Sequence, residues 1–381
     1  MQAYLDNSAT TQPSARVIEE MTRAMREAFY NPSSLYAPAM GPEKEMNLCR
    51  DKIRRALASR DATVYFTSGG TEANNLALFG SAGVMRPPMR AAVSAVEHPS
   101  ILEASERLKE YGIEVVRIGV NGRGEIDYNQ LEEELARGLS LVSFMQVNNE
   151  TGAKLDVKRL SDTVRAHSRD TRIHVDGVQG FLREDIDFKL IDMYTLSAHK
   201  IHGPKGVGAL VVRKGLRLKP VQVGGGQEDA IRSGTENTYG IIGLSCAIDE
   251  MLAMKDRHEV LMAKKTLLVN EMRARIPEIL INGPEIEEGA PHIVNLGFPG
   301  VRGEVMLHAL EEDRVYASTG SACSSKKRHV SPVLLAMGIP ADKAEWALRF
   351  SLSPYTADEE IIYAAETAQK KYEILKRFQR R

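Results

Sequence analysis

The pattern of apolar and polar positions predicts a regular succession of strands and helices between about residues 15 and 215. The expected strands are Val64–Thr67, Ala91–Val96, Glu114–Val120, Leu141–Val147, Ile173–Asp176, Met193–Ser197 and Ala209–Arg213. The expected helices are Ala15–Glu27, Glu43–Ala58, Thr71–Phe79, Pro99–Glu110, Tyr128–Arg137 and Val157–His167. Strands that alternate with helices in this way imply a mainly parallel sheet with helices on both faces.

The pattern changes after about residue 215. Glycines at 224–226 and 234 indicate a long loop, and a long helical stretch follows from about Gly243 to Ile276. The remainder, Ile279 to Arg381, reads as a mixed α/β region, and 381 residues correspond to about two domains. We expect a large domain over residues 15–255 and a small domain formed by residues 1–14 and 256–381.

Composition and charge exclude several classes of protein. With 50 basic and 51 acidic residues the net charge is -1, which argues against a general polyanion binder, so we expect no direct nucleic-acid partner. The first residues lack the basic and apolar regions of a signal peptide, and no stretch approaches 18 uncharged apolar residues. We therefore expect a cytoplasmic protein that does not enter the membrane.

The chain has only three cysteines: Cys49, Cys246 and Cys323. Their odd number and wide spacing argue against a disulfide framework, and no CxxC pair suggests a metal site. A reducing compartment fits this usage best. A functional cysteine in this chain would act alone, as a thiol.

Two strand ends carry a carboxylate and an amine. One strand ends at Asp176, and another ends at Ser197 and leads directly to Lys200. Ligands of parallel sheets bind beyond the carboxyl ends of the strands. A lysine together with an acid suits pyridoxal phosphate, because the lysine bonds the aldehyde and the acid pairs with the pyridinium nitrogen.

A phosphate site is also predicted. The segment Phe66–Asn75 combines a strand, a glycine turn and the start of a helix, whose free N–H groups favour an anion. The hydroxyl of Thr71 would add a donor, although a simple turn with an N-cap is the structural alternative. His98 follows another strand and could stack on a flat ring, or serve only in packing.

Ten short motifs, in order along the chain, resemble those of the NifS/IscS-like cysteine desulfurases, which are class V, fold-type I pyridoxal-phosphate enzymes. The motifs are Tyr4–Thr11, Asn31–Leu35, Thr67–Asn75, Glu97-His98, Val147–Gly152, His174–Asp176, Ser197–Lys200, Arg232–Thr235, Ser321–Cys323 and Arg349–Leu352. The resemblance implies an α/β fold, with a large domain built on a mainly parallel seven-stranded sheet and a smaller α/β C-terminal domain.

The resemblance implies a role for each cofactor-binding residue. Lys200 would hold the cofactor and move protons, Asp176 would pair with the pyridine nitrogen, and His98 would stack on the ring and act as an acid or base. Gln179 would bond the ring hydroxyl, and Asn149 the ring oxygen or the substrate. The phosphate would be held by Gly70, Thr71, Ser197 and His199.

Two further residues extend the implied site. Thr235 would reach the phosphate of the other subunit, which implies a homodimer. Arg349 would clamp the carboxylate of the substrate, L-cysteine, because a planar guanidinium binds a carboxylate through two hydrogen bonds.

Cys323 is the residue that distinguishes a cysteine desulfurase from other enzymes of the same fold. It lies in the small, polar segment Ser318–Arg328 with three cations after it, and a cysteine beside positive charge typically has a lowered pKa. The family reading makes Cys323 the acceptor of the substrate's sulfur, leaving alanine and a persulfide. That sulfur would pass to an iron–sulfur scaffold, a tRNA-thiolation protein or a carrier. Cys49 and Cys246 fit packing positions.

Two alternatives remain open from the sequence. A selenocysteine lyase or another class V enzyme would share the same fold, and a sulfur-relay scaffold without catalysis would belong to another class of protein. The chain also departs from the family pattern in two places: Tyr36 stands where histidine often follows the Asn31–Leu35 motif, and Gly177 stands where alanine is usual.

Overall fold

The larger part of the molecule is built on one seven-stranded sheet. The computed structural model describes residues 1–87, 89–320 and 330–378. The strand order is β2-β8-β7-β6-β5-β3-β4, and only β8 runs antiparallel to its neighbours. The strands are β2 Thr63–Thr67, β3 Arg90–Ser94, β4 Glu114–Ile118, β5 Leu141–Met145, β6 Arg172–Asp176, β7 Met193–Ser197 and β8 Gly208–Val212. The predicted mainly parallel seven-stranded sheet is confirmed.

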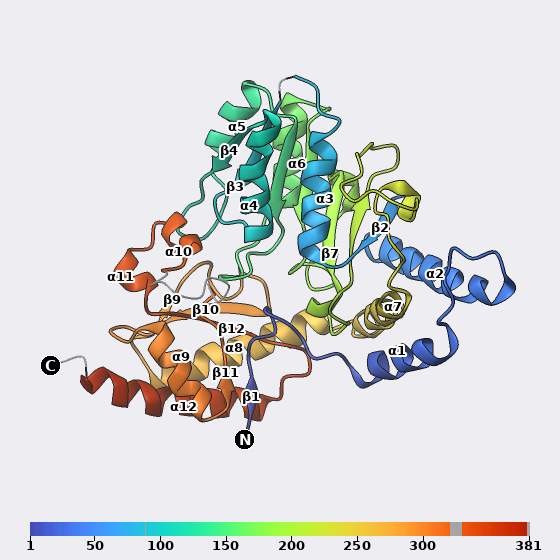
Figure 1. Cartoon of the computed structure of the whole chain (residues 1–381). Coiled ribbons are helices and arrows are strands. Elements are labelled where there is room, and N and C mark those ends of the chain that lie inside the picture. Colours follow the sequence, from blue (N-terminus) through green and yellow to red (C-terminus); the bar gives the residue numbers. More distant parts are fainter. Residues whose placement is uncertain (88, 321–329, 379–381) are drawn as a thin grey trace.

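Helices cover both faces of this sheet (Figure 1). On one face, α3 and α4 pack against residues such as Leu141 and Val93. On the other face, α2, α5, α6 and α7 pack against residues such as Val142 and Phe144, while α1 packs on α7. The helices are α1 Ala15–Glu27, α2 Met40–Ala56, α3 Gly70–Ala82, α4 Pro99–Leu108, α5 Tyr128–Ala136, α6 Val157–His167 and α7 Thr238–Ala253. Successive strand residues thus enter opposite cores, as in sheets buried on both sides.

A second hydrophobic core lies below the first in Figure 1. It combines residues near the N-terminus, such as Leu5, with residues between Leu261 and Tyr372. Its helices are α8 Arg257–Arg275, α9 Gly303–Glu312 and α12 Asp358–Phe378. Two short helices, α10 Pro332–Ala336 and α11 Ala341–Ala344, pack in a separate small cluster with Val96 of the large domain's sheet region. Its strands are β1 Ala3–Tyr4, β9 Leu280–Ile281, β10 Ile293–Gly297, β11 Val315–Tyr316 and β12 Ala347–Ser351. The division into domains at residues 15 and 255 stays a prediction that this separation of cores favours.

Short 3-10 helices connect several of these elements. They are η1 Ala37–Ala39, η2 Lys109–Tyr111, η3 Phe188–Leu190, η4 Ala198–Lys200 and η5 Glu228–Ala230. In the part of the chain that is described, none of the helices has the length and apolar character needed to cross a bilayer.

The long helical stretch expected from Gly243 to Ile276 is wrong in one respect, because it consists of two helices. The chain leaves helical geometry after Ala253 and resumes it at Arg257. The reason lies in the packing: α7 buries Leu244 in the core of the large sheet, whereas α8 buries Leu268 in the second core. The intervening residues 254–256 contain neither glycine nor proline to mark this break.

Candidate active site

The predicted acid and amine emerge from adjacent strand ends of the large sheet. β6 ends at Asp176, and its parallel neighbour β7 ends at Ser197, where η4 carries the chain to Lys200. The carboxyl ends of parallel strands form the usual ligand site of such sheets. The structure therefore brings Asp176 and Lys200 to one edge, as the sequence predicts.

The Lys200 amine lies in a largely buried environment. Its Nζ donates to the carbonyl oxygens of Ser8, at 2.5 Å, and Ala9, at 2.7 Å. Burial, followed by the charges of Arg349 and Arg183, lowers the pKa of Lys200 to about 7. A substantial fraction of this amine is therefore uncharged near neutral pH, which is the form that attacks a carbonyl carbon.

Asp176 is 5% exposed and is held by two donors. Its Oδ2 accepts from Asn74 Nδ2 at 2.7 Å, and its Oδ1 accepts from the Val178 backbone N–H at 3.0 Å. These hydrogen bonds fix the carboxylate at the end of β6. Asn74 belongs to the Thr67–Asn75 motif, but no role was predicted for it.

His98 forms the N-cap of α4. Its Nδ1 accepts from the backbone N–H of Ser100 at 3.1 Å and lies 2.8 Å from Ser100 Oγ. Burial lowers the pKa of His98, so the ring is neutral at pH 7, and the proton resides on Nε2 because Nδ1 accepts. Asn74 also donates to Ser100 Oγ at 2.8 Å, so a chain of hydrogen bonds links His98 to Asp176.

The first turn of α3 offers an anion site. No side chain caps this helix at Gly69, so its first N–H groups are free to bind an external acceptor. A Cβ at Gly70 would lie 2.6 Å from Val178 Cγ2 and 3.7 Å from Ser197 Cβ, so only glycine fits there without displacing Val178. Ser197 Oγ is buried and has no hydrogen-bond partner among the described residues. Thr71 lies exposed in the same first turn.

Of the remaining predicted cofactor residues, His199 and Gln179 contact the N-terminal segment, whereas Thr235 has no such contact in the described part of the chain. His199 Nδ1 lies 3.2 Å from Thr10 Oγ1, and burial, then Lys200, lowers its pKa to about 4, so it is neutral at pH 7. Gln179 Nε2 donates to the Ser8 carbonyl at 2.9 Å. Thr235 is exposed and makes no hydrogen bond to the other predicted residues within the described ranges.

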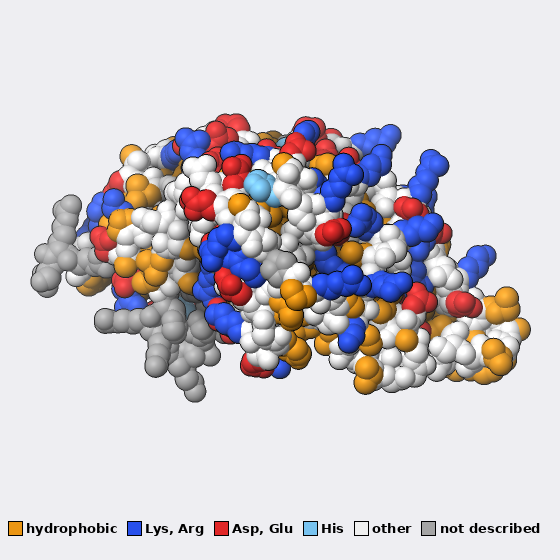
Figure 2. All heavy atoms as spheres, turned by 90° about the horizontal axis from the view of Figure 1, so that it is seen from above, with side chains coloured by type: hydrophobic (Ala, Val, Ile, Leu, Met, Phe, Trp, Pro, Cys, Tyr) orange, Lys and Arg blue, Asp and Glu red, His pale blue; other side chains and the backbone are white. Residues whose placement is uncertain are grey.

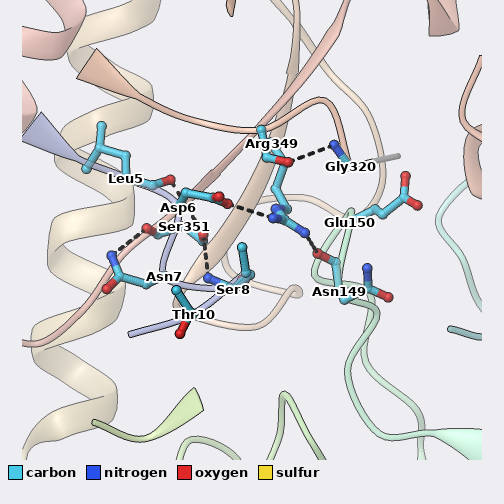
Figure 3. Close-up of polar contacts among 12 residues, drawn as sticks. Leu5, Asp6, Asn7, Ser8, Thr10, Asn149, Glu150, Gly320, Arg349 and Ser351 are labelled. Carbon is cyan, nitrogen blue, oxygen red and sulfur yellow. Dashed lines mark hydrogen bonds and ion pairs between the residues drawn. The ribbon is translucent and has the colours of Figure 1, made fainter. Parts of the chain in front are cut away.

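Arg349 reaches the site from β12, in the second core (Figure 3). It is 4% exposed; its Nη2 donates to Asp6 Oδ1 at 2.6 Å and its Nη1 donates to the Asn149 backbone carbonyl at 2.9 Å. Its Nε is buried and has no partner among the described residues. The guanidinium is thus held in place, and its Nε–H is left for another acceptor. The sequence predicted Arg349 and Asn149 but missed Asp6.

The N-terminal segment joins the two cores at this site (Figure 3). Asn7 Nδ2 donates to the Ser351 carbonyl at 2.9 Å, and the Ser8 N–H donates to Ser351 Oγ at 2.8 Å. Thr11 Oγ1 donates to the His199 carbonyl at 2.9 Å. These contacts are the structural reason for the Tyr4–Thr11 motif, which the sequence had linked only to the family.

The structure describes two of the three cysteines. Cys323 lies outside the described residues. Cys49 and Cys246 are buried in the large core, so their predicted packing role is confirmed. Burial raises the pKa of Cys49 to about 12 and also raises that of Cys246, which leaves both thiols protonated and unreactive. Within the described ranges, no group of three or more His, Cys, Asp or Glu side chains could hold a metal ion.

Gly177, one of the two departures from the family pattern, has a packing explanation. A Cβ at this position would lie 1.9 Å from Cζ of Tyr194, whose ring fills the space. The Tyr194 hydroxyl donates to Gln146 Oε1 at 2.6 Å, which holds the ring there. Tyr36, the other departure, lies exposed just before η1.

Comparisons with known proteins match this chain over almost its whole length. A family model described as aminotransferase class-V matches residues 3–363. The cysteine desulfurase IscS of Clostridium botulinum is 37% identical over 374 residues, which is 97% of this chain and 94% of that relative. A solved structure titled NifS-like protein is 31% identical with a TM-score of 0.90, and covers 98% of this chain and 100% of its own. Another, titled SspA in complex with cysteine, is 29% identical with a TM-score of 0.81 and covers 93% and 100%. The chain therefore belongs to the class-V aminotransferase family and, within it, to the cysteine desulfurases.

Proposed function

We propose that this cysteine desulfurase binds pyridoxal phosphate at Lys200 and transfers the sulfur of L-cysteine to Cys323. One observation carries the cofactor assignment. The largely buried Lys200 amine, whose pKa is lowered to about 7, lies at the same sheet edge as Asp176. The cysteine complex of the SspA structure supports the choice of substrate.

The residues present fit pyridoxal phosphate. The unpartnered Ser197 hydroxyl and the uncapped start of α3 match a phosphate, and Asp176 matches a protonated ring nitrogen. His98 and His199 are neutral, and Gln179 offers an amide N–H. When bound, this cofactor supplies an aldehyde that bonds amino groups and a ring that accepts electrons from a neighbouring carbon.

Arg349 and Lys200 would act directly on the substrate. The Arg349 guanidinium, with its spare Nε donor, would bind the carboxylate of cysteine, and the Asp6 and Asn149 contacts would keep it oriented. The uncharged Nζ of Lys200 would take the proton from the substrate's α-carbon and return it later. The side chain of Asn149 would complete the substrate contacts.

Cys323 would complete the reaction. Its thiolate would attack the sulfur of the bound substrate, forming an S–S bond while the carbon–sulfur bond breaks with its electron pair moving to carbon, which then takes a proton. The products are alanine and a persulfide, whose sulfur would go to an acceptor protein such as an iron–sulfur scaffold, a tRNA-thiolation protein or a carrier. A free thiol of this kind requires a reducing compartment, for which we propose the cytoplasm.

We also propose a homodimer in which Thr235 reaches the phosphate site of the partner. Thr235 is exposed, and within the described ranges it makes no hydrogen bond to its own subunit's proposed site. The segment between α1 and α2 exposes large apolar side chains that a second copy would cover, with Phe29 59% exposed and Leu35 fully exposed.

Mass spectrometry of the intact chain after exposure to cysteine tests the proposed function. One added sulfur should appear, and peptide mapping should locate it on Cys323. Cys323→Ala should still bind the cofactor and cysteine but release no sulfide in the presence of a reductant, whereas Cys246→Ala should turn over like the wild type. Full turnover by Cys323→Ala, or sulfur located on Cys49 or Cys246, would contradict the assignment.

A further inference from the structure

Arg183 is a buried cation beside the site, and it has no acidic partner among the described residues. It follows β6 in the turn Gly177–Glu184 and is 3% exposed. Within the described residues its Nε has no hydrogen-bond partner, and burial alone accounts for the lowering of its pKa to about 10, so it stays charged at pH 7. Burying an unpaired charge is costly, so this arrangement needs a compensating role.

The guanidinium binds two residues of the proposed site. Its Nη2 donates to the backbone carbonyl of Lys200, and its Nη1 donates to Gln179 Oε1 at 3.3 Å. A guanidinium has only donors, so Gln179 must face it with the carbonyl oxygen. The amide N–H₂ of Gln179 then points away, toward the Ser8 carbonyl that also accepts from Lys200 Nζ. A closed ring of contacts results, which runs through Arg183, Gln179, Ser8 and Lys200.

The turn that holds Arg183 is itself strained and anchored. Leu182, directly before it, has φ +60°, a left-handed conformation that is unfavourable for a leucine. The carbonyl of Leu182 accepts from Arg257 Nε at 2.5 Å, which fixes the turn to the start of α8. Strain of this kind persists where the surrounding structure enforces it, often at functional sites.

We propose that Arg183 is a positioning residue for the reaction: it orients the Gln179 amide, holds the Lys200 backbone, and supplies an interior positive charge next to the Lys200 segment. This inference rests on the proposed function of Lys200. A positive charge nearby disfavours the ammonium form, and the Arg349 charge acts in the same direction. The charged and titratable groups around this amine are Arg183, Arg349, Asp6, Asp176, His98 and His199.

The test measures how fast pyridoxal phosphate bonds to Lys200 in the full-length chain after the cofactor is removed. Stopped-flow absorbance measures the rate of this bonding step between about pH 5.5 and 9.5. The rate rises with pH as the Lys200 amine loses its proton, and the pH of the half-maximal rate is the midpoint of the curve. The wild type should show a midpoint near 7, set by the pKa of Lys200. Arg183→Met should move the midpoint upward by roughly one pH unit. Arg183→Lys, which keeps the charge, should stay near the wild type.

Arg257→Met is the matched control, because it loosens the same turn without touching Lys200 or Gln179. It should lower the melting temperature but leave the pH midpoint in place. A midpoint in Arg183→Met equal to the wild type would overturn the inference. If Arg183→Met does not fold, the pH midpoint of Arg183→Gln is compared with the wild type instead, since glutamine is uncharged but keeps an N–H donor. Failure of the wild type to bond the cofactor at Lys200 would instead overturn the proposed function.

Discussion

At the scale of single residues, the buried donors of the site include two that have no hydrogen-bond partner among the described residues. They are Ser197 Oγ, at the end of β7, and Arg349 Nε, on β12. Unsatisfied polar groups are rare in protein interiors, because each costs about 1–3 kcal/mol. Their presence at the predicted phosphate and carboxylate positions indicates that the chain is prepared for ligands that complete these hydrogen bonds.

Ser197→Ala should therefore have opposite effects on the free and the loaded protein. Without cofactor, removal of an unsatisfied hydroxyl should leave the free energy of unfolding unchanged or raise it by up to about 1 kcal/mol. Cofactor binding should weaken by roughly 10-fold to 100-fold, because a hydrogen bond to a charged group contributes about 1.5–3 kcal/mol. Denaturant unfolding and equilibrium titration with pyridoxal phosphate measure the two quantities.

Ser143→Ala provides the comparison for this prediction. Ser143 is equally buried on β5, but its Oγ lies 2.8 Å from His174 Nδ1, so it has a partner to lose. This variant should be less stable by about 1 kcal/mol and bind the cofactor normally. Unchanged cofactor affinity in Ser197→Ala would show that the hydroxyl does not hold the phosphate.

At the scale of elements, local signals explain what the sequence could predict. α1 and α6 begin and end where expected, because Ser14 and Asp156 cap them through backbone N–H groups only three residues away. The Asp6–Arg349 pair joins residues 343 positions apart. No local pattern reports such a contact, and the same holds for the packing that separates α7 from α8. Arg183 was missed because its partners are a backbone carbonyl and an amide, which leave no pattern of charges.

The loop before α7 shows how an element can be held in a strained conformation. Glu228, Asp229 and Ala230 all have left-handed φ values, of 49°, 55° and 60°, each of which costs about 1–2 kcal/mol. The buried Glu228 carboxylate anchors the loop: Oε1 accepts from Arg50 Nη2 at 2.6 Å, and Oε2 accepts from the Phe66 N–H at 2.9 Å. This loop leads to Thr235, the residue proposed to serve the partner's site.

Glu228→Gln should release this loop, because one of the two acceptor oxygens becomes an NH₂ donor that faces either Arg50 Nη2 or the Phe66 N–H, which are donors themselves. The free energy of unfolding should fall by about 1.5–3 kcal/mol, and limited proteolysis should cut within residues 221–237 more rapidly. Asp229→Asn, whose side chain is exposed, should behave like the wild type in both measurements. Equal stability and equal cleavage in Glu228→Gln would show that Glu228 does not anchor the loop.

At the scale of the whole molecule, the site lies where two separate cores meet. Asp176 and Lys200 come from the large sheet, whereas Arg349 comes from β12, and the N-terminal segment bonds to both sides. The groups proposed to bind the cofactor and the substrate thus come from different cores, so the proposed site is complete only when the two cores are held together. The sequence predicted most of these residues through their motifs, but Cys323 lies outside the described part of the chain and its geometry stays a prediction.

The prediction of a homodimer also concerns the whole molecule, because it depends on an exposed apolar surface. Figure 2 shows hydrophobic side chains gathered at the end of the molecule formed by the segment between α1 and α2. The large apolar side chains exposed in this segment are Phe29, Leu35 and Tyr36, followed by Met40 at the start of α2, and each is at least 52% exposed. If a second copy covers this segment, a charge there would be buried without a partner on association, which is strongly unfavourable. Leu35→Asp should therefore convert the dimer to a monomer in light scattering after gel filtration. Because Thr235 of the partner would then be missing, cofactor should also be lost more readily.

Ile374→Asp, on the exposed face of α12, is the control for this prediction, and it should remain dimeric and keep its cofactor. A dimer that survives Leu35→Asp with its cofactor intact would place the interface elsewhere.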